Sequence, residues 1–188
     1  MKPLISTFTF ILLLTGCVHS QDSLKNYSVS LSVLIDSLSI PGEGIHIEID
    51  KSDYTLSIMK ESMLLKQYPV VFGSDPVKDK LRQGDRRTPE GEFRVRTKYP
   101  HRSWDKFIWI NYPTEDSWKK HRQAKLDGLI DESDGIGGEI GIHGVPFGSD
   151  YMIDVRMNWT LGCISLKNDD INDFYPYIRE GTLVIIEK

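Results

Sequence analysis

The feature that most constrains this chain is a series of short segments with the pattern of half-buried β-strands. In IHIEID, residues 45–50, isoleucine alternates with polar residues, which gives a strand one apolar and one polar face. Residues 54–60 and 63–73 have strand character on either side of a short polar turn, which predicts a hairpin. Further strands are expected at 92–99, 105–112, 139–144 and 182–188. The series predicts a mainly β domain.

Two segments have the pattern of helices instead. Residues 113–126, PTEDSWKKHRQAKL, begin with a proline and acidic residues and end with basic residues, as the helix dipole favours. Residues 169–180, DDINDFYPYIRE, follow Asn168 as the expected cap and stop before Gly181. The expected fold class is therefore mainly β with helical insertions.

The first residues have the pattern of an export signal. MKPLISTFTFILLLTGC contains a positive Lys2, an apolar run too short to span a bilayer, and small residues before Cys17. The end of this stretch, LTGC, resembles the bacterial lipoprotein lipobox, which implies cleavage before Cys17 and lipid attachment to it; a simple secretory signal is the alternative. The expected organisation is a signal at 1–16, a lipidated N-terminus and serine-rich tether at 17–43, and a folded domain at 44–188. Within the tether, residues 27–38 contain scattered apolar side chains and could instead form a short helix or pack on the domain.

The predicted export signal and lipidation determine where the mature protein is expected. Lipid chains on Cys17 would hold it on a membrane of the cell envelope, at the periplasmic face. Val18 follows that cysteine, in place of the aspartate that resembles an inner-membrane retention signal, so the outer membrane is the expected site in a cell with two membranes.

Composition excludes several partners. Without the signal, about 170 residues remain, which suits one domain and a monomer. The formal net charge of −4 gives no strong field, so neither nucleic acid nor an anionic membrane surface is an expected partner. The five histidines show no paired metal-ligand spacing, and only one thiol remains beside Cys17. We therefore expect neither a metal nor another cofactor.

That remaining thiol, Cys163, has two interpretations. A lone cysteine is commonly a small buried hydrophobe. In an exported protein, however, an unpaired thiol is exposed to oxidation. Gly162 and the polar run after Cys163 indicate a backbone corner, and His143 ends an upstream strand segment in GIHG. A histidine beside a thiol can generate the nucleophilic thiolate, so this pair is a candidate for nucleophilic catalysis.

These motifs together resemble a known family. IHG at 142–144, TLGCI at 160–164, Asn168, Asp170 and the final GTLVII look like the catalytic signature of the YkuD-type L,D-transpeptidases. YPVVFG at 68–73 and GDRRTPEGEF at 84–93 resemble the same family, closest to the murein transpeptidase branch that includes hydrolases of protein–peptidoglycan links. The resemblance runs from about residue 45 to the end and implies a β-sandwich catalytic domain at 44–188.

The resemblance also implies a mechanism. Cys163 would attack the carbonyl between the third residue of a peptidoglycan tetrapeptide stem and its terminal D-alanine, with His143 as base and then acid. The residue after the histidine orients the ring in the family, and Gly144 can do so only through its backbone. Backbone amides of Leu161, Gly162 and Cys163 would stabilise the oxyanion. An amine acceptor would give a cross-link or an attached protein, and water would give hydrolysis; the sequence leaves both open.

This chain departs from the family pattern next to the nucleophile. Thr160 and Leu161 stand where Ser-His or Ser-Arg is common, and Ser165 replaces a frequent arginine. Arg156 or Lys167 would then bind the substrate carboxylate in its place. Thr160 and Trp159 are further expected substrate contacts.

Some interpretations stay open. Asp154 or Asp169 could orient the histidine through a side chain, although Asp169 and Asp170 are better interpreted as helix-capping residues. The stretch 113–138 ends in the acidic, glycine-rich DESDGIGG, which fits either a mobile lid or a solvated loop. A lipoprotein that binds the wall without catalysis is the alternative to an enzyme.

Overall fold

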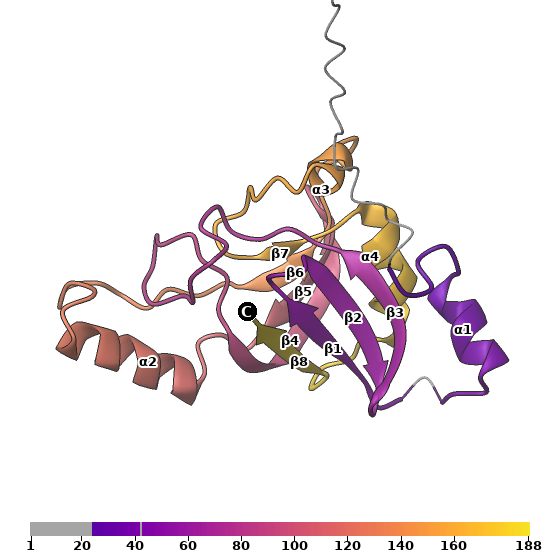
Figure 1. Ribbon diagram of the computed structural model, residues 1–188, viewed down its shortest axis with the longest axis horizontal. Coiled ribbons are helices and arrows are strands. Elements are labelled where there is room, and N and C mark those ends of the chain that lie inside the picture. The colour runs from indigo at the N-terminus through magenta and orange to yellow at the C-terminus, as the bar shows by residue number, and fades with distance from the viewer. Residues whose placement is uncertain (1–23, 42) are drawn as a thin grey trace, which may run out of the picture.

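A computed structural model describes residues 24–41 and 43–188. Its strands form a curled sheet in the order β3-β2-β1-β8-β4-β5-β6-β7 (Figure 1). The strands are β1 Ile45–Asp50, β2 Thr55–Lys60, β3 Met63–Pro69, β4 Gly91–His101, β5 Asp105–Ile110, β6 Gly141–His143, β7 Ile164–Ser165 and β8 Leu183–Glu187. The helices are α1 Leu31–Ser37, α2 Glu115–Leu126, α3 Tyr151–Asp154, α4 Asn168–Phe174 and the 3-10 turn η2 Tyr175–Tyr177. Within the described ranges, no helix is long and apolar enough to cross a bilayer.

Strand β4 joins the two halves of the sheet. Its first residues, 91–94, pair with β8, and residues from Val95 onward pair with β5. The register shifts between Val95 and Thr97, where such irregularities bend a strand. Buried side chains from both halves, such as Ile47 and Ile142, belong to one core cluster. The predicted fold class, mainly β with helical insertions, is confirmed.

The strongest sequence pattern gives the most regular part of the sheet. In β1, Ile45, Ile47 and Ile49 are buried and the residues between them are half-buried. This strand pairs antiparallel with β2, which forms the predicted hairpin with β3. β1 also pairs in parallel with β8, so it lies inside the sheet.

Both predicted helices are shorter than their sequence patterns. α2 begins at Glu115, because the side chain of Thr114 caps it together with Ser117 in a reciprocal pair of hydrogen bonds. α4 ends at Phe174, and the chain continues as η2. The physical reason is Pro176, which has no backbone N–H and so cannot donate the next helical hydrogen bond.

The caps predicted for α4 were wrong. Lys167 occupies the cap position, and no side-chain hydrogen bond caps the helix. Asn168 lies inside the helix, and its Oδ1 accepts a hydrogen bond from the Val145 amide at 3.0 Å. Asp170 is buried and accepts a hydrogen bond from the Tyr27 hydroxyl at 3.0 Å, so it anchors another segment instead of capping.

That segment is the described part of the predicted tether, and it packs against the domain. Leu31 and Ile35 of α1 are buried. The Leu31 amide donates to Asp173 Oδ1 at 2.9 Å, and Lys66 Nζ lies 2.7 Å from Asp173 Oδ2. Residues 24–40 are therefore part of the fold. The predicted signal and Cys17 lie outside the described residues.

Candidate active site

The site forms at the β6–β7 end of the sheet. These strands are parallel, with His143 opposite Ser165. Cys163 directly precedes β7, and continuing this register by one residue places it opposite Gly141. Gly141 lies two positions before His143 on the same strand. Alternate residues of a strand share one face and lie about 7 Å apart, so the thiol and the imidazole project to the same side. Both line one cleft of about 990 Å³.

The His143 ring is held by backbone and aromatic contacts. Its Nδ1 lies 2.7 Å from the carbonyl oxygen of Gly144. A carbonyl only accepts, so Nδ1 carries the proton and Nε2 is left as a free base. The Trp104 ring stacks on the imidazole at 4.5 Å, and the Trp159 ring stands perpendicular to it at 5.5 Å. Burial lowers the pKa of His143 to about 4, against its ordinary value of 6.5.

Gly144 can occupy its position only as glycine. A Cβ there would lie 2.1 Å from Asn168 Oδ1 and 2.7 Å from the Trp104 carbonyl oxygen. The Gly144 carbonyl also accepts a hydrogen bond from Ser165 Oγ at 3.2 Å. Ser165, which stands where the family often has arginine, is therefore a buried partner of the group that orients the histidine.

The Cys163 thiol is neutral at rest. Its Sγ donates to the Glu139 carbonyl oxygen at 3.5 Å. Burial raises the pKa of Cys163 to about 11, although the Gly141 backbone and the charge of Lys80 act in the opposite direction. Thiol and imidazole therefore form a neutral pair, not a resting ion pair.

The turn before the thiol is braced by Thr160. Its Oγ1 donates to the Cys163 carbonyl at 2.7 Å and accepts from the Gly162 amide at 3.2 Å. Gly162 has a φ of 138°, and a Cβ on it would lie 2.7 Å from the Arg87 carbonyl oxygen. The Thr160 hydroxyl, expected to contact substrate, instead holds the turn, although Thr160 does line the cleft. The Gly162 amide, expected in the oxyanion site, is already occupied.

Three chain segments form the walls of the large cleft, together with Trp104 and His143. They are 80–86, 137–140 and 159–163. Its charged lining residues are Lys80, Arg86 and Glu139. The Gln83 amide donates to the Gly135 carbonyl oxygen at 2.7 Å, so the end of the 113–138 stretch is joined to the 80–86 segment. Closure of this stretch as a lid stays a prediction.

A second cleft, of about 280 Å³, meets the first at the thiol. Cys163, Trp104 and Glu139 line both clefts. The remaining lining of the second cleft is aromatic: Tyr99, His101, Phe107 and Trp109. The His101 and Trp104 rings stack at 4.3 Å. Two separate spaces therefore give access to one sulfur.

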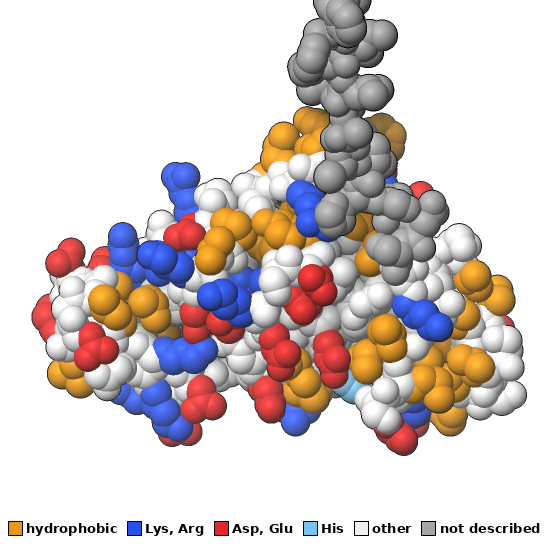
Figure 2. Space-filling view, in the orientation of Figure 1, with side chains coloured by type: hydrophobic (Ala, Val, Ile, Leu, Met, Phe, Trp, Pro, Cys, Tyr) orange, Lys and Arg blue, Asp and Glu red, His pale blue; other side chains and the backbone are white. Residues whose placement is uncertain are grey.

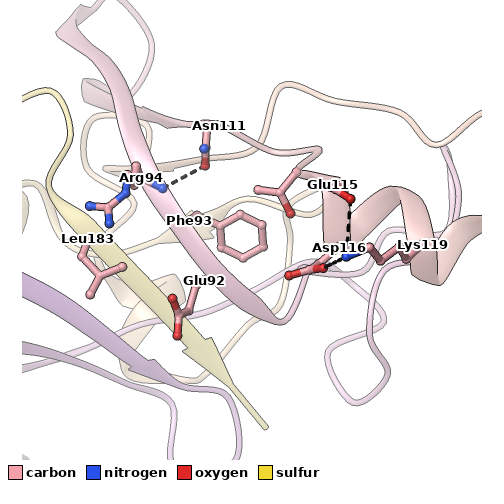
Figure 3. A pocket seen from close by; sticks show the side chains of 9 residues that line it. Glu92, Phe93, Arg94, Asn111, Glu115, Asp116, Lys119 and Leu183 are labelled. Atoms are coloured by element: carbon pink, nitrogen blue, oxygen red, sulfur yellow. Dashed lines mark hydrogen bonds and ion pairs between the residues drawn. The ribbon is translucent and has the colours of Figure 1, made fainter.

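A third cleft, of about 360 Å³, lies where the start of α2 approaches β4 and β8 (Figure 3). Its lining is mostly polar and charged, with Phe93 and Leu183 as apolar members, and Lys119 pairs with Glu115 and Asp116. Neither Cys163 nor His143 lines it. On the face shown in Figure 2, basic and acidic side chains are interspersed over α2 and the neighbouring loops.

The other predicted site residues are partly displaced from the cleft. Trp159 lines it with Cys163 and His143. Arg156 does not, because its guanidinium lies over the Tyr54 ring at 5.0 Å. Lys167 pairs with Asp154 at 2.6 Å. Neither cation predicted to bind a substrate carboxylate is therefore among the cleft residues.

Several cleft residues were not predicted from the sequence, and three of them lie in functionally prominent places. Arg86, Trp104 and Glu139 line the large cleft, and the last two also line the second. Arg86 lies inside the motif GDRRTPEGEF, so the family resemblance could have indicated it. Its proximity to Cys163, however, depends on how a loop folds back on the sheet.

Comparisons with known proteins identify the family and the fold. Residues 44–186 match the family described as YkuD, L,D-transpeptidase catalytic domain. No curated protein matches the sequence. Among solved structures, Bd1075 of Bdellovibrio bacteriovorus is similar with a TM-score of 0.53 at 20% identity, over 77% of this chain and 48% of that chain. For the helical cell shape determining protein Pgp2 of Campylobacter jejuni, the TM-score is 0.53 at 18% identity, over 84% of this chain and 55% of that chain.

A third similar structure is L,D-transpeptidase 3 of Mycobacterium tuberculosis in complex with a faropenem-derived adduct. Its TM-score is 0.51 at 13% identity, over 77% of this chain and 60% of that chain. At these identities the likeness concerns the fold. The present chain spans about half of the first two proteins' length.

Proposed function

The chain belongs to the YkuD family of L,D-transpeptidase catalytic domains, and on that premise we propose that it transfers acyl groups of peptidoglycan stem peptides through a thioester at Cys163. The observation that carries the proposal is the common face of Cys163 and His143 in one cleft, with Nε2 of the histidine free. This is the arrangement that a thiol nucleophile and its base require.

The proposed reaction starts from the neutral pair. As Sγ of Cys163 attacks the stem carbonyl, Nε2 of His143 takes the thiol proton. The resulting imidazolium then gives that proton to the nitrogen of the leaving D-alanine as the C–N bond breaks. The Gly144 carbonyl, which accepts from Nδ1, supports the positive imidazolium during this step. A thioester and free D-alanine result.

The oxyanion of the tetrahedral intermediate needs donors near the sulfur. Because the Gly162 amide donates to Thr160, we propose the amides of Leu161 and Cys163 as these donors. Loss of one such donor typically costs about 3 kcal/mol of barrier. The turn that Thr160 braces is therefore expected to lower the barrier in addition to the two catalytic side chains.

The second cleft favours transfer over hydrolysis. An acyl acceptor must reach the thioester carbon while the acyl group occupies its own cleft. The aromatic cleft beside Cys163 offers a separate space for such an acceptor. We therefore propose an amine acceptor, which would give a cross-link or a protein attachment, with hydrolysis as the competing outcome.

Cellular location forms a separate proposal that rests on the sequence alone. We propose that a lipid on Cys17 anchors the mature protein at the periplasmic face of the envelope, in the outer membrane where there are two. Mass spectrometry of the N-terminal peptide from the membrane fraction tests this. A mature N-terminus other than a lipidated Cys17 would contradict it.

The decisive test of the function is intact mass spectrometry of the protein incubated with a purified tetrapeptide stem, with D-alanine release measured in parallel. Wild type should gain an acyl group and release D-alanine, and Cys163→Ala and His143→Ala should do neither. Adding an amine acceptor should give an acylated amine; the bare acid as sole product would indicate a hydrolase. A folded wild type that binds stems without an adduct or D-alanine release would indicate a non-catalytic binding protein.

A further inference from the structure

The large cleft holds two exposed charged side chains, Arg86 and Glu139, whose functions the proposed reaction does not explain. Arg86 is exposed, and within the described ranges its side chain has no hydrogen-bond or ion-pair partner. Lys80, the other cation of the cleft, is buried and bound to Asp85 at 2.8 Å and to the Arg82 carbonyl at 3.0 Å. Only Arg86 of these two is therefore available to a ligand.

Neighbouring basic residues on the same loop are already paired. Arg87 Nε lies 2.8 Å from Asp75 Oδ2, and Arg82 Nη1 lies 3.5 Å from Asp134 Oδ1. Asp85, the nearest carboxylate in sequence, accepts hydrogen bonds from Lys80 and from three backbone amides. The loop thus pairs its other charges and leaves the Arg86 guanidinium unpaired in the cleft.

The backbone of Arg86 is fixed relative to the nucleophile. Its φ is 57°, and its carbonyl accepts from the Asp75 amide at 3.2 Å. A Cβ on Gly73 would lie 2.1 Å from that carbonyl oxygen and 3.0 Å from Gly162 Cα, so these three backbones are in close contact. Gly162 directly precedes Cys163. The attachment point of the Arg86 side chain is therefore set by the turn that presents the thiol.

We propose that Arg86 binds a carboxylate of the acyl-donor peptide and so determines specificity for acidic stems. The inference rests on the proposed function, because that function supplies a substrate with a terminal carboxylate. A guanidinium forms paired hydrogen bonds with a carboxylate, a geometry that an ammonium group cannot reproduce. Arg86 would thus take the role that Arg156 and Lys167, turned away from the cleft, do not have.

The experiment combines protein and ligand changes. Arg86→Ala and Arg86→Lys are compared with wild type on three stems: one with free carboxylates, one with a C-terminal amide and one amidated throughout. Arg122→Ala is the control, because Arg122 is an exposed arginine on α2 outside the cleft. Acylation is followed by D-alanine release or by mass. Stem binding is measured by calorimetry in the Cys163→Ala background, where no thioester can form.

We expect Arg86→Ala to raise KM and Kd for the free stem on the order of tenfold or more, with a much smaller change in kcat. Arg86→Lys should recover part of this, and Arg122→Ala should match wild type. If Arg86 binds the terminal carboxylate, Arg86→Ala should no longer change KM and Kd for the stem with a C-terminal amide. If Arg86 binds an internal carboxylate, the change should persist for that stem and vanish only for the fully amidated one.

Each failure has its own signature. If wild type acylates and Arg86→Ala affects charged and amidated stems equally, or not at all, the role of Arg86 is wrong and the proposed function stands. If binding shows the Arg86-dependent preference without acylation, the proposed function fails and the recognition stands. Absence of both binding and acylation in folded wild type would overturn both. Thermal melting identifies any variant whose defect is one of folding.

Discussion

The two ends of the sheet are stabilised in different ways. At the β3-β2-β1-β8 end, strands of five to seven residues bury alternating isoleucines and other apolar side chains. At the β6–β7 end, strands of three and two residues are too short to hold themselves by pairing. That end depends on glycines that allow close backbone contact and on side-chain bonds such as those of Thr160. Stability and reactivity are therefore separable by mutation.

The largest expected effect lies at the regular end. Ile47→Ala removes a fully buried side chain and should lower the free energy of unfolding by about 4 kcal/mol. Urea denaturation measures this. Under conditions where the variant remains folded, its acylation rate should match wild type. A lower rate per folded molecule would show that the two ends are coupled.

The pH dependence of the free energy of unfolding should come from the β6–β7 end of the sheet. Burial holds the pKa of His143 near 4, below its ordinary 6.5, so the unfolded chain binds a proton more readily than the folded chain. The stability that this neutral histidine confers is complete above 6.5 and is lost as the pH falls to 4, by up to about 3 kcal/mol. Urea denaturation at several pH values should show this loss, and His143→Gln should reduce it. An unchanged profile in that variant would assign the loss to other groups.

The brace of the nucleophile turn should affect catalysis more than folding. Thr160→Val removes the hydroxyl that bonds the Gly162 amide and the Cys163 carbonyl. We expect the acylation barrier to rise by about 2 kcal/mol, while Thr160→Ser, which keeps the hydroxyl, stays close to wild type. D-alanine release kinetics measure the rate and melting measures the fold. Equal kinetics for the valine and serine variants would contradict the role of the brace.

The smallest effect is expected where the N-terminal segment packs against α4. Tyr27→Phe deletes the hydrogen bond to buried Asp170 and should cost about 1 kcal/mol of stability, with activity unchanged. Tyr151→Phe, at an exposed position, is the control. Urea denaturation and hydrogen exchange in α1 measure the change. A loss of acylation in Tyr27→Phe would show that this segment supports the site.

The same contrast explains what the sequence could and could not predict. The alternation at 45–50 predicted a strand with the bounds that β1 has, because local burial repeats every second residue. The two residues of β7 show no period and were not predicted. The N-terminal segment binds Asp170 through Tyr27 and Asp173 through Leu31 of α1. Both aspartates lie more than a hundred residues further along the chain, so these partners had no local signal.

The site divides in the same way. Cys163 and His143 could be proposed from the two motifs and from what a thiol nucleophile requires. The hydrogen bond that occupies the Gly162 amide and the unpaired state of Arg86 depend on the geometry of loops. The periodicity of a sequence carries no information on such loop geometry. The two cations predicted from the sequence, Arg156 and Lys167, therefore lie outside the cleft.

The orientation of His143 by a peptide carbonyl has a consequence for how this protein can change over generations. Every residue carries a carbonyl, so no exchange of one side chain for another deletes the group that accepts from Nδ1. Random mutation can silence the pair by replacing the thiol or the imidazole, but it can reach the third group only by enlarging Gly144 and moving the peptide. In a lineage of such proteins, loss of the third group would thus require displacement of the peptide, whereas in one that relied on an aspartate the exchange of one side chain would remove it.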